Sequence, residues 1–350
     1  MKNSIRILIC FFVSMGLFSC GRAEKIPARP LPAPVVNDTV ETVDSLEQVT
    51  DTLPVMNPDT VIEDTTDPPA ESDDPVSIIS PDLTVNMETN METAEVYAYL
   101  QKIADTARMY NTVSVYYLDT QNGWYYAVDA DQMYESASTI KAIYCQYLLS
   151  SGVDMSQEIL LSQSNRTSAS GALRQEHIGT VFTVADLILY TIRYSDNMAY
   201  RLLFETFGCE GYNDYVTSLG LPGLSLSTSY EFNRITCRDL ALGMVEIYNY
   251  SEISGDTTIV ELLKNTTFNA QIDAGTSYPV AHKYGYQGGD KGYHDAAIVY
   301  ADPSPYILTI MTKEDPSAGD GNAVFREMAV LTESLHDVLC GGSVTPDANP

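Results

Sequence analysis

The sequence has few basic residues, few histidines and few cysteines. It holds 19 Lys and Arg against 47 Asp and Glu, which gives a formal net charge of −28 at pH 7. A protein that binds the phosphate backbone of nucleic acid needs a basic face, so we expect no nucleic-acid partner. The sequence also lacks the patterns C-x-x-C, H-E-x-x-H and G-x-x-x-x-G-K-[ST], and its four histidines are scattered. We therefore expect no zinc or other metal site, no nucleotide site and no cofactor.

The N-terminus has no apolar run long enough to span a bilayer comfortably. Lys2 and Arg6 give a basic start, and the apolar run that follows covers only residues 7–18. The segment Leu17-Phe18-Ser19-Cys20-Gly21 resembles a lipoprotein signal box, so residues 1–20 are predicted to be a lipoprotein-type signal peptide. Cleavage would leave a lipidated Cys20 on an extracytoplasmic, membrane-anchored lipoprotein. Ordinary secretory cleavage, which would give a secreted protein, or an uncleaved anchor are the alternatives.

Residues 21–93 lack the side chains that build a core. No aromatic residue occurs between Cys20 and Tyr97, and no basic residue between Arg29 and Lys102, while Pro, Thr, Ser and Asp dominate. Such a segment cannot bury enough apolar surface to offset the entropy of ordering. We predict an acidic, disordered tether with a root-mean-square span of about 45–50 Å, which would hold a domain away from the membrane.

A hydroxyl and an amine lie three residues apart at Ser138 and Lys141. The run that follows, residues 140–149, contains no Gly or Pro, and its apolar residues nearly surround a helix, which predicts a buried one. Residues at i and i+3 share a helix face, so the two side chains can touch if a helix begins at Ser138. Burial lowers the pKa of a lysine, and a neutral Lys141 could take the proton of Ser138. Alone the pattern is weak, since Ser138 could be a cap and Lys141 a surface residue.

Two further polar segments follow. Ser195-Asp196-Asn197 separates two apolar segments and predicts a loop between buried helices, although a polar helix-capping loop is the plain alternative. His282-Lys283-Tyr284-Gly285 is followed by a glycine-rich turn at residues 288–292 and an apolar run at 296–300, which together predict a hairpin. Alone, Lys283 would be an ordinary strand cation.

Together, the three segments resemble the S-x-x-K, S-D-N and K-T-G signature of the class A β-lactamases and the wider penicillin-recognising serine hydrolases. Residues 170–173, 235–241 and 294–300 resemble further segments of that family, so the similarity covers about residues 95–340. It implies catalytic roles for Ser138 as nucleophile, Lys141 as base, Ser195 as proton donor to the leaving nitrogen, and Lys283 as partner of Ser195 and of the substrate carboxylate.

The resemblance also implies a set of substrate-binding residues: Asn197, Tyr284, Gly285 and Tyr286. The backbone N–H groups of Ser138 and Tyr286 would form the oxyanion hole. Two departures bear on the substrate and the mechanism. Tyr284 stands where the family has a small hydroxyl residue. The family's Ω-loop glutamate, the deacylation base, is missing, and Glu231 matches it by residue type but not by position.

We therefore predict a serine hydrolase that forms an acyl-enzyme at Ser138, most similar to β-lactamases that hydrolyse β-lactam amide bonds. A D-Ala-D-Ala peptidase or esterase acting near the cell wall is one alternative, and a penicillin-binding sensor without turnover is another. The expected partners are a small-molecule β-lactam or a cell-wall peptide, with the membrane reached through the lipid anchor. The protein is expected to be a monomer.

The predicted fold is α+β, with an antiparallel sheet built from both chain ends and an inserted all-helical lobe. The folded domain is assigned to residues 94–340, followed by a tail at 341–350. Helices are expected at 94–110 and 322–339, and strands at 113–119, 124–128 and 306–312. The stretch 208–235, where the family has its Ω-loop, is expected to be shortened. In an oxidising compartment, a disulfide between Cys209 and Cys237 is expected, since these residues flank that stretch.

Overall fold

The structure is a computed structural model that describes residues 77–80, 83–87, 93–110, 112–165, 171–228, 231–288, 292–313 and 321–341. The predicted signal peptide, the lipidation site Cys20, most of the predicted tether and the tail beyond Gly341 lie outside these residues. Within the described residues, no helix is both long and apolar enough to cross a membrane.

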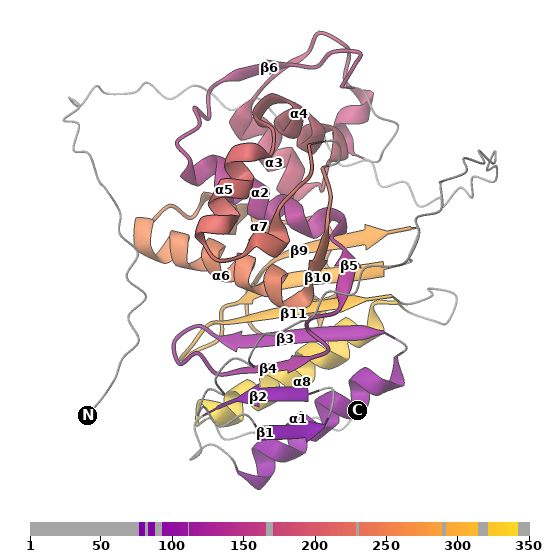
Figure 1. Cartoon of the computed structure of the whole chain (residues 1–350), viewed down its shortest axis with the longest axis vertical. Helices are drawn as coiled ribbons and strands as arrows, with labels where there is room; N and C mark the ends of the chain where they lie inside the picture. The colour runs from indigo at the N-terminus through magenta and orange to yellow at the C-terminus, as the bar shows by residue number, and fades with distance from the viewer. Residues whose placement is uncertain are drawn as a thin grey trace, which may run out of the picture. The chain divides into compact units, whose positions relative to one another are not determined.

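The described residues form a seven-stranded antiparallel sheet with the strand order β1-β2-β4-β3-β11-β10-β9 (Figure 1). Its strands are β1 (Ser77–Ser80), β2 (Leu83–Asn86), β3 (Val113–Asp119), β4 (Tyr125–Val128), β9 (Val280–Gln287), β10 (Gly292–Val299) and β11 (Tyr306–Thr312). In the centre, β3 from the N-terminal part pairs with β11 from the C-terminal part, from Val113↔Thr312 to Asp119↔Tyr306. The prediction of an α+β fold with a sheet built from both chain ends is therefore confirmed.

Strands β1 and β2 correct the predicted boundary of the tether. They lie inside the segment 21–93 that was expected to be disordered, and β2 pairs with β4 from Leu83↔Val128 to Asn86↔Tyr125. Leu83 and Val85 are buried, and Met87 beyond the strand is buried too. This local apolar alternation is typical of a half-buried strand, but the acidic, proline-rich composition around it obscures the signal. The folded part thus begins before residue 94.

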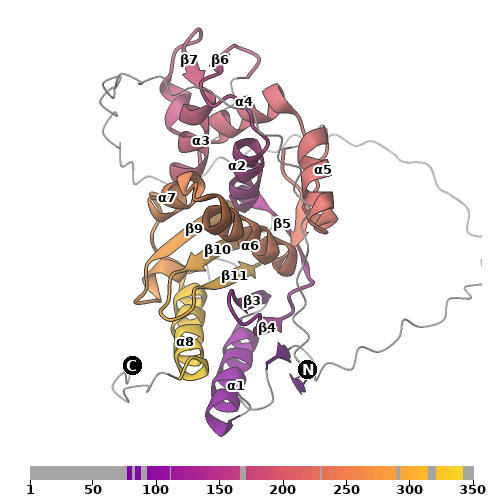
Figure 2. The ribbon, with the colours of Figure 1, turned by 90° about the vertical axis from the view of Figure 1, so that its left-hand side faces the viewer.

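Helices cover both faces of the sheet. α1 (Ala94–Met109) and α8 (Ala323–Leu339) pack together on one face, and the helical lobe covers the other (Figure 2). Along β10, Ala297 and Val299 belong to the core shared with α1 and α8, whereas Ala296 and Ile298 belong to the core of the lobe. Because neither face meets water, the second half of β10, from Ala296 to Val299, is apolar on both sides.

The lobe contains most of the elements between β4 and β9. Its helices are α2 (Ile140–Ser150), α3 (Val184–Arg193), α4 (Asn197–Phe207), α5 (Glu210–Ser218), α6 (Cys237–Ser254) and α7 (Thr258–Lys264). Its short strands are β5 (Met133–Glu135), β6 (Glu158–Leu160), β7 (Val181–Thr183) and β8 (Arg234–Thr236). Its 3-10 turns are η2 (Ala137–Thr139), η3 (Ala172–Gln175) and η4 (Pro222–Leu224). A further turn, η5 (Ile272–Ala274), lies outside the lobe, because it contacts α8 and its Ile272 belongs to the core on the other face of the sheet.

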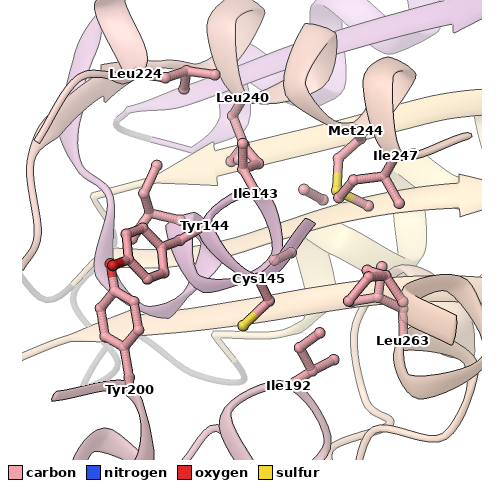
Figure 3. Close-up of a cluster of buried hydrophobic side chains, with 14 of the residues drawn as sticks. Ile143, Tyr144, Cys145, Ile192, Tyr200, Leu224, Leu240, Met244, Ile247 and Leu263 are labelled. Atoms are coloured by element: carbon pink, nitrogen blue, oxygen red, sulfur yellow. The ribbon is translucent and has the colours of Figure 1, made fainter. Parts of the chain in front are cut away.

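Helix α2 lies at the centre of the lobe, with eight of its eleven residues buried. Figure 3 shows Ile143 of α2 next to Leu240 of α6, within a cluster that also contains Tyr144 and Met244. The prediction of a buried helix is confirmed. Its start differs from the expectation, because Ser138 belongs to the 3-10 turn η2 and the α-helix begins at Ile140.

The expected disulfide between Cys209 and Cys237 is wrong. Both residues are buried free thiols. The Cys237 side chain points at the sheet, where its sulfur lies 3.3 Å from the backbone carbonyl oxygen of Thr309 on β11 and 3.6 Å from that of Ser114 on β3. Cys209 lies instead at the N-terminus of α5. A sequence that places two cysteines on either side of a loop does not determine the directions of their side chains.

We predict that purified protein, denatured without a reductant and treated with an alkylating reagent, carries the label on both Cys209 and Cys237. Peptide mapping by mass spectrometry measures this directly. The midpoint of thermal unfolding should also be the same with and without dithiothreitol, because no cross-link constrains the unfolded chain. A Cys209–Cys237 disulfide peptide would contradict the structure.

Candidate active site

The three polar segments found in the sequence meet where the edge strand β9 passes the turn η2. Gly285 of β9 makes this approach possible, because a Cβ atom there would lie 3.0 Å from the backbone nitrogen of Ser138 and 3.0 Å from the Cβ of Ala137. Contacts that short are tighter than nine in ten Cβ contacts in proteins, so a side chain at this position would force the neighbouring atoms to shift. The close approach sets the backbone of β9 beside the backbone of Ser138.

Lys141 is fully buried and donates two hydrogen bonds to the loop between α3 and α4. Its Nζ lies 2.8 Å from the backbone oxygen of Ser195 and 2.6 Å from Oδ1 of Asn197. The rings of Tyr200 and Phe232 lie 5.6 and 6.0 Å from Nζ. Burial lowers the pKa of Lys141 to about 7, although the charge of Asp196 acts in the opposite direction. A substantial fraction of Lys141 is therefore neutral near pH 7.

Lys283 is the second buried lysine of the site. Its Nζ donates to Oγ of Ser195 at 2.9 Å and to the backbone oxygen of Tyr284 at 3.0 Å. Burial holds the pKa of Lys283 well below its ordinary value, and the positive charge of Lys141 lowers it further. Ser195 thus meets both lysines, one through its carbonyl oxygen and one through its hydroxyl.

The backbone of Ser195 adopts a left-handed conformation with φ of 53°. Such a conformation is uncommon for a residue other than glycine and stores strain. It is held by Asp196, whose Oδ1 accepts from the backbone nitrogens of Met198 and Ala199 at 2.8 and 2.9 Å and so caps α4. The sequence left open that this segment only caps the next helix. Asp196 does cap α4, but the hydroxyl of Ser195 accepts a hydrogen bond from Lys283.

Asp196 also ties the loop to the turn η3, and sequence reasoning assigned it no role. Its Oδ2 accepts from the backbone nitrogen of Leu173 at 2.8 Å. Gly171 lies against the same carboxylate, and a Cβ at Gly171 would come within 2.3 Å of Oδ2. The signal in the sequence was the central position of Asp196 in Ser195-Asp196-Asn197. Its partners Gly171 and Leu173, however, lie more than twenty residues earlier in the chain.

Ser138 is only partly buried, and its hydroxyl makes no hydrogen bond with the described residues. The predicted contact between Ser138 and Lys141 is therefore not a hydrogen bond in this structure, where Lys141 is bonded to Ser195 and Asn197. The structure does bring Ser138, Lys141, Ser195, Asn197 and Lys283 into one region. Their catalytic roles stay predictions.

Tyr284 shapes one side of the site. The ring of Tyr284 packs on that of Phe268 with 4.4 Å between the two centroids. Nζ of Lys283 also lies 4.4 Å from the centroid of the Tyr284 ring. Burial raises the pKa of the Tyr284 hydroxyl, and its hydrogen bond with Ser195 acts in the opposite direction. An aromatic pair thus stands beside Ser195. Tyr286, two residues further along β9, is 51% exposed.

A buried ion pair supports β9 next to Lys283. Nδ1 of His282 lies 3.0 Å from both carboxylate oxygens of Asp295 on β10, and its Nε2 lies 2.9 Å from Oγ1 of Thr266. Burial disfavours the charged imidazole, but Asp295 outweighs this effect and raises the pKa of His282. With Asp273, these residues form a group of potential metal ligands, yet both imidazole nitrogens are already engaged.

Glu231 lies on the loop that leads to β8, on the side of Lys141 that faces Phe232. Its backbone oxygen accepts from the Tyr200 hydroxyl at 2.7 Å, and its charge acts to raise the pKa of Lys141. The structure thus places a half-buried carboxylate in the electrostatic surroundings of Lys141.

Comparison with known proteins adds an independent observation. A family model described as "Beta-lactamase enzyme family" matches residues 95–334. The β-lactamase FAR-1 of Nocardia farcinica is 28% identical over 245 residues, covering 63% of this chain and 77% of that protein. The β-lactamase ROB-1 of Haemophilus influenzae is 32% identical over 133 residues, covering 37% of this chain and 43% of that protein.

Solved structures resemble the fold. A protein described as PBP-A has a TM-score of 0.59 at 19% identity and covers 71% of this chain and 97% of its own. A β-lactamase from Sphaerobacter thermophilus has a TM-score of 0.59 at 20% identity and covers 68% of this chain and 95% of its own. At such low identity, these likenesses show the fold alone.

We predict that Gly285→Ala slows covalent labelling of Ser138 by a fluorescent penicillin at least about tenfold, because the added methyl group displaces β9 from Ser138 and small displacements of a reacting group are costly. The rate of labelling, followed on gels, measures the effect. Gly288→Ala is the matched control, since a Cβ there meets nothing closer than 3.8 Å. Equal rates for both variants and the wild type would show that the close approach is not needed.

We also predict that the labelling rate rises with pH through about 7, the pKa that burial gives Lys141. The sign follows from the role predicted for Lys141: if the neutral amine takes up the Ser138 proton, the reactive form accumulates as pH rises through the pKa of Lys141. Stopped-flow or gel kinetics across that range measure the profile, with circular dichroism to confirm that the fold persists. A rate that does not change between mildly acidic and mildly alkaline pH would contradict the role of Lys141.

Proposed function

The chain belongs to the β-lactamase enzyme family, and from this membership we propose that it is a serine hydrolase that forms an acyl-enzyme at Ser138. One observation carries the proposal. Two fully buried lysines with lowered pKa values converge on Ser195 beside Ser138, through the hydrogen bonds of Lys141 and Lys283. Strongly shifted pKa values in a cluster of nucleophilic side chains are typical of catalytic sites.

In the proposed acylation step, neutral Lys141 accepts the proton of Ser138 while Oγ of Ser138 attacks the carbonyl carbon. The backbone N–H groups of Ser138 and Tyr286 would stabilise the oxyanion, each such donor contributing about 2.7–4 kcal/mol in other hydrolases. The carbonyl carbon–nitrogen bond breaks as Ser195 gives a proton to the leaving nitrogen. Lys283, 2.9 Å from Oγ of Ser195, assists that transfer, and Asn197 orients the substrate amide.

Hydrolysis of the acyl-enzyme needs a base that activates water. Glu231 is the proposed candidate, because it is half-buried and acts electrostatically on Lys141. It does not occupy the position of the family's Ω-loop glutamate in the sequence. With Glu231 as the candidate base, we propose β-lactam hydrolysis as the activity of this site.

A second candidate function is a D-Ala-D-Ala peptidase or esterase, or a penicillin sensor that stays acylated. The aromatic pair Tyr284–Phe268 beside Ser195 favours this candidate, because it stands where the family has a small hydroxyl residue. A bulky pair there changes the space and the polar groups available to a substrate carboxylate. We further propose an extracytoplasmic location with a lipid anchor at Cys20, and a monomeric state, on the sequence pattern alone.

Time-resolved mass spectrometry of the intact protein with benzylpenicillin tests these functions. We expect a mass gain at Ser138 that disappears while the drug is consumed. Ser138→Ala should give no adduct, and Ser218→Ala, which alters an exposed serine on α5, should behave as the wild type.

The other outcomes assign the alternatives. An adduct that persists, together with release of D-Ala from a D-Ala-D-Ala peptide, identifies the peptidase, and persistence without release identifies the sensor. If Glu231 is the base, Glu231→Gln should lengthen the lifetime of the adduct without slowing its formation. Absence of any adduct on the wild type would overturn the acyl-enzyme proposal.

A further inference from the structure

The ring of Tyr284 covers the amine of Lys283 at the edge of the sheet. β9 is the last strand in the order of the seven-stranded sheet, so the side chain of Tyr284 can turn round this edge toward the lobe. There the Tyr284 hydroxyl forms a hydrogen bond with Ser195, and Nζ of Lys283 lies 4.4 Å from the ring centroid. The acylation step described above uses Ser195 and Lys283 but not this ring.

Lys283 directs its hydrogen bonds at groups of the protein. An ammonium group has three N–H donors, and Nζ of Lys283 donates to Oγ of Ser195 at 2.9 Å and to the backbone oxygen of Tyr284 at 3.0 Å. Nζ also lies over the Tyr284 ring in a cation–π arrangement, and the side chain of Lys283 is fully buried. In this arrangement, no carboxylate of a substrate reaches Nζ of Lys283 unless Tyr284 moves.

Phe268 holds the ring of Tyr284 in place. The two rings pack with 4.4 Å between their centroids and an angle of 34° between their planes, and such aromatic pairs contribute more than the area they bury. The segment that carries Phe268 is fixed in turn, because the backbone nitrogen and the hydroxyl of Thr267 donate to the backbone oxygen of Arg193 at 3.0 and 3.2 Å. The ring that covers Lys283 is therefore held by tertiary contacts.

The aromatic surface continues along β9. Side chains two residues apart leave a strand on the same side, and Tyr286 follows Tyr284 at that spacing. Tyr286 is exposed and packs on Tyr293 of β10 with 4.9 Å between centroids, while Tyr284 and Phe268 are half-buried. A carboxylate against such a surface loses water without gaining a partner, whereas an apolar group is stabilised by burial.

We propose that this site takes acyl compounds whose leaving part is uncharged and apolar, such as neutral esters and lactams, and that Tyr284 with Phe268 sets this preference. The inference rests on the proposed acyl-enzyme at Ser138 and names its substrate class. The leaving part meets the rings because Ser195, the proposed proton donor to the leaving atom, is hydrogen-bonded to the Tyr284 hydroxyl.

The chemical step is the acylation already proposed. Oγ of Ser138 bonds to the carbonyl carbon and gives its proton to Lys141. The bond from that carbon to the leaving nitrogen or oxygen breaks, and the leaving atom receives a proton from Ser195. Benzylpenicillin, whose leaving part carries a carboxylate, still reacts, but more slowly than its neutral methyl ester.

The test is a competition between benzylpenicillin and its methyl ester for the full-length chain, stopped early and read by mass spectrometry of the Ser138 peptide. The two adducts differ by one methylene group, so a single sample gives the ratio of their rates. We expect the methyl ester to react at least about tenfold faster in the wild type. Tyr284→Phe keeps the ring and should keep this ratio.

Two further variants test the rings themselves. Tyr284→Thr uncovers Lys283 and should move the ratio toward the free acid at least about tenfold. Because each variant meets the same two compounds, differences in their intrinsic reactivity cancel. Phe268→Ala leaves the hydrogen bonds of Ser195 in place and should slow the methyl ester more than the acid.

Tyr99→Thr is the matched control. It removes a half-buried ring that lies 5.3 Å from Nζ of Lys102 on α1, and it should keep the wild-type ratio. A free acid that reacts as fast as its ester in the wild type, or an unchanged ratio in Tyr284→Thr and Phe268→Ala, would overturn the inference while leaving the acyl-enzyme intact. Absence of any adduct with both compounds would overturn the acyl-enzyme and this inference with it.

Discussion

The structure depends on the burial of two lysines, Lys141 and Lys283, around one serine. Neither ammonium group forms an ion pair within the described residues, and each is satisfied instead by oxygens of the loop between α3 and α4 or of β9. Removing such groups from water disfavours their charged forms. The same burial that lowers stability creates an amine able to accept a proton at neutral pH. The nearby elements therefore have to keep water out, although the carboxylates of Asp196 and Glu231 oppose the effect of burial on Lys141.

The two-sided cover of the sheet meets that requirement. Helix α2 carries Lys141 through the centre of the lobe, and the edge strand β9 carries Lys283 past η2, with Gly285 allowing the contact. The ion pair of His282 with Asp295 links β9 to β10 next to Lys283. The apolar core therefore sets the electrostatics of the two lysines as well as the stability of the fold.

Patterns within short stretches of sequence predicted the helix and the hairpin that those stretches form. The apolar run after Ser138 identified a buried helix, and the residues on both sides of Gly288 identified the β9–β10 hairpin. Features that depend on distant partners were missed or misjudged. The role of Asp196 requires Gly171 and Leu173, and β2 is stabilised by pairing with β4. The free thiols of Cys209 and Cys237 depend on the directions of their side chains, which the spacing of two cysteines does not determine.

The left-handed backbone of Ser195 places stability and the proposed activity in opposition at one residue. Glycine would adopt φ of 53° without strain, yet it would remove the hydroxyl that faces Lys283. Natural variation at this position is therefore constrained from two sides, and the fold has to tolerate a locally unfavourable residue. The hydrogen bonds by which Asp196 caps α4 stabilise the loop next to this residue. Attempts to make this protein more heat-resistant by relaxing its backbone would meet their limit at this loop.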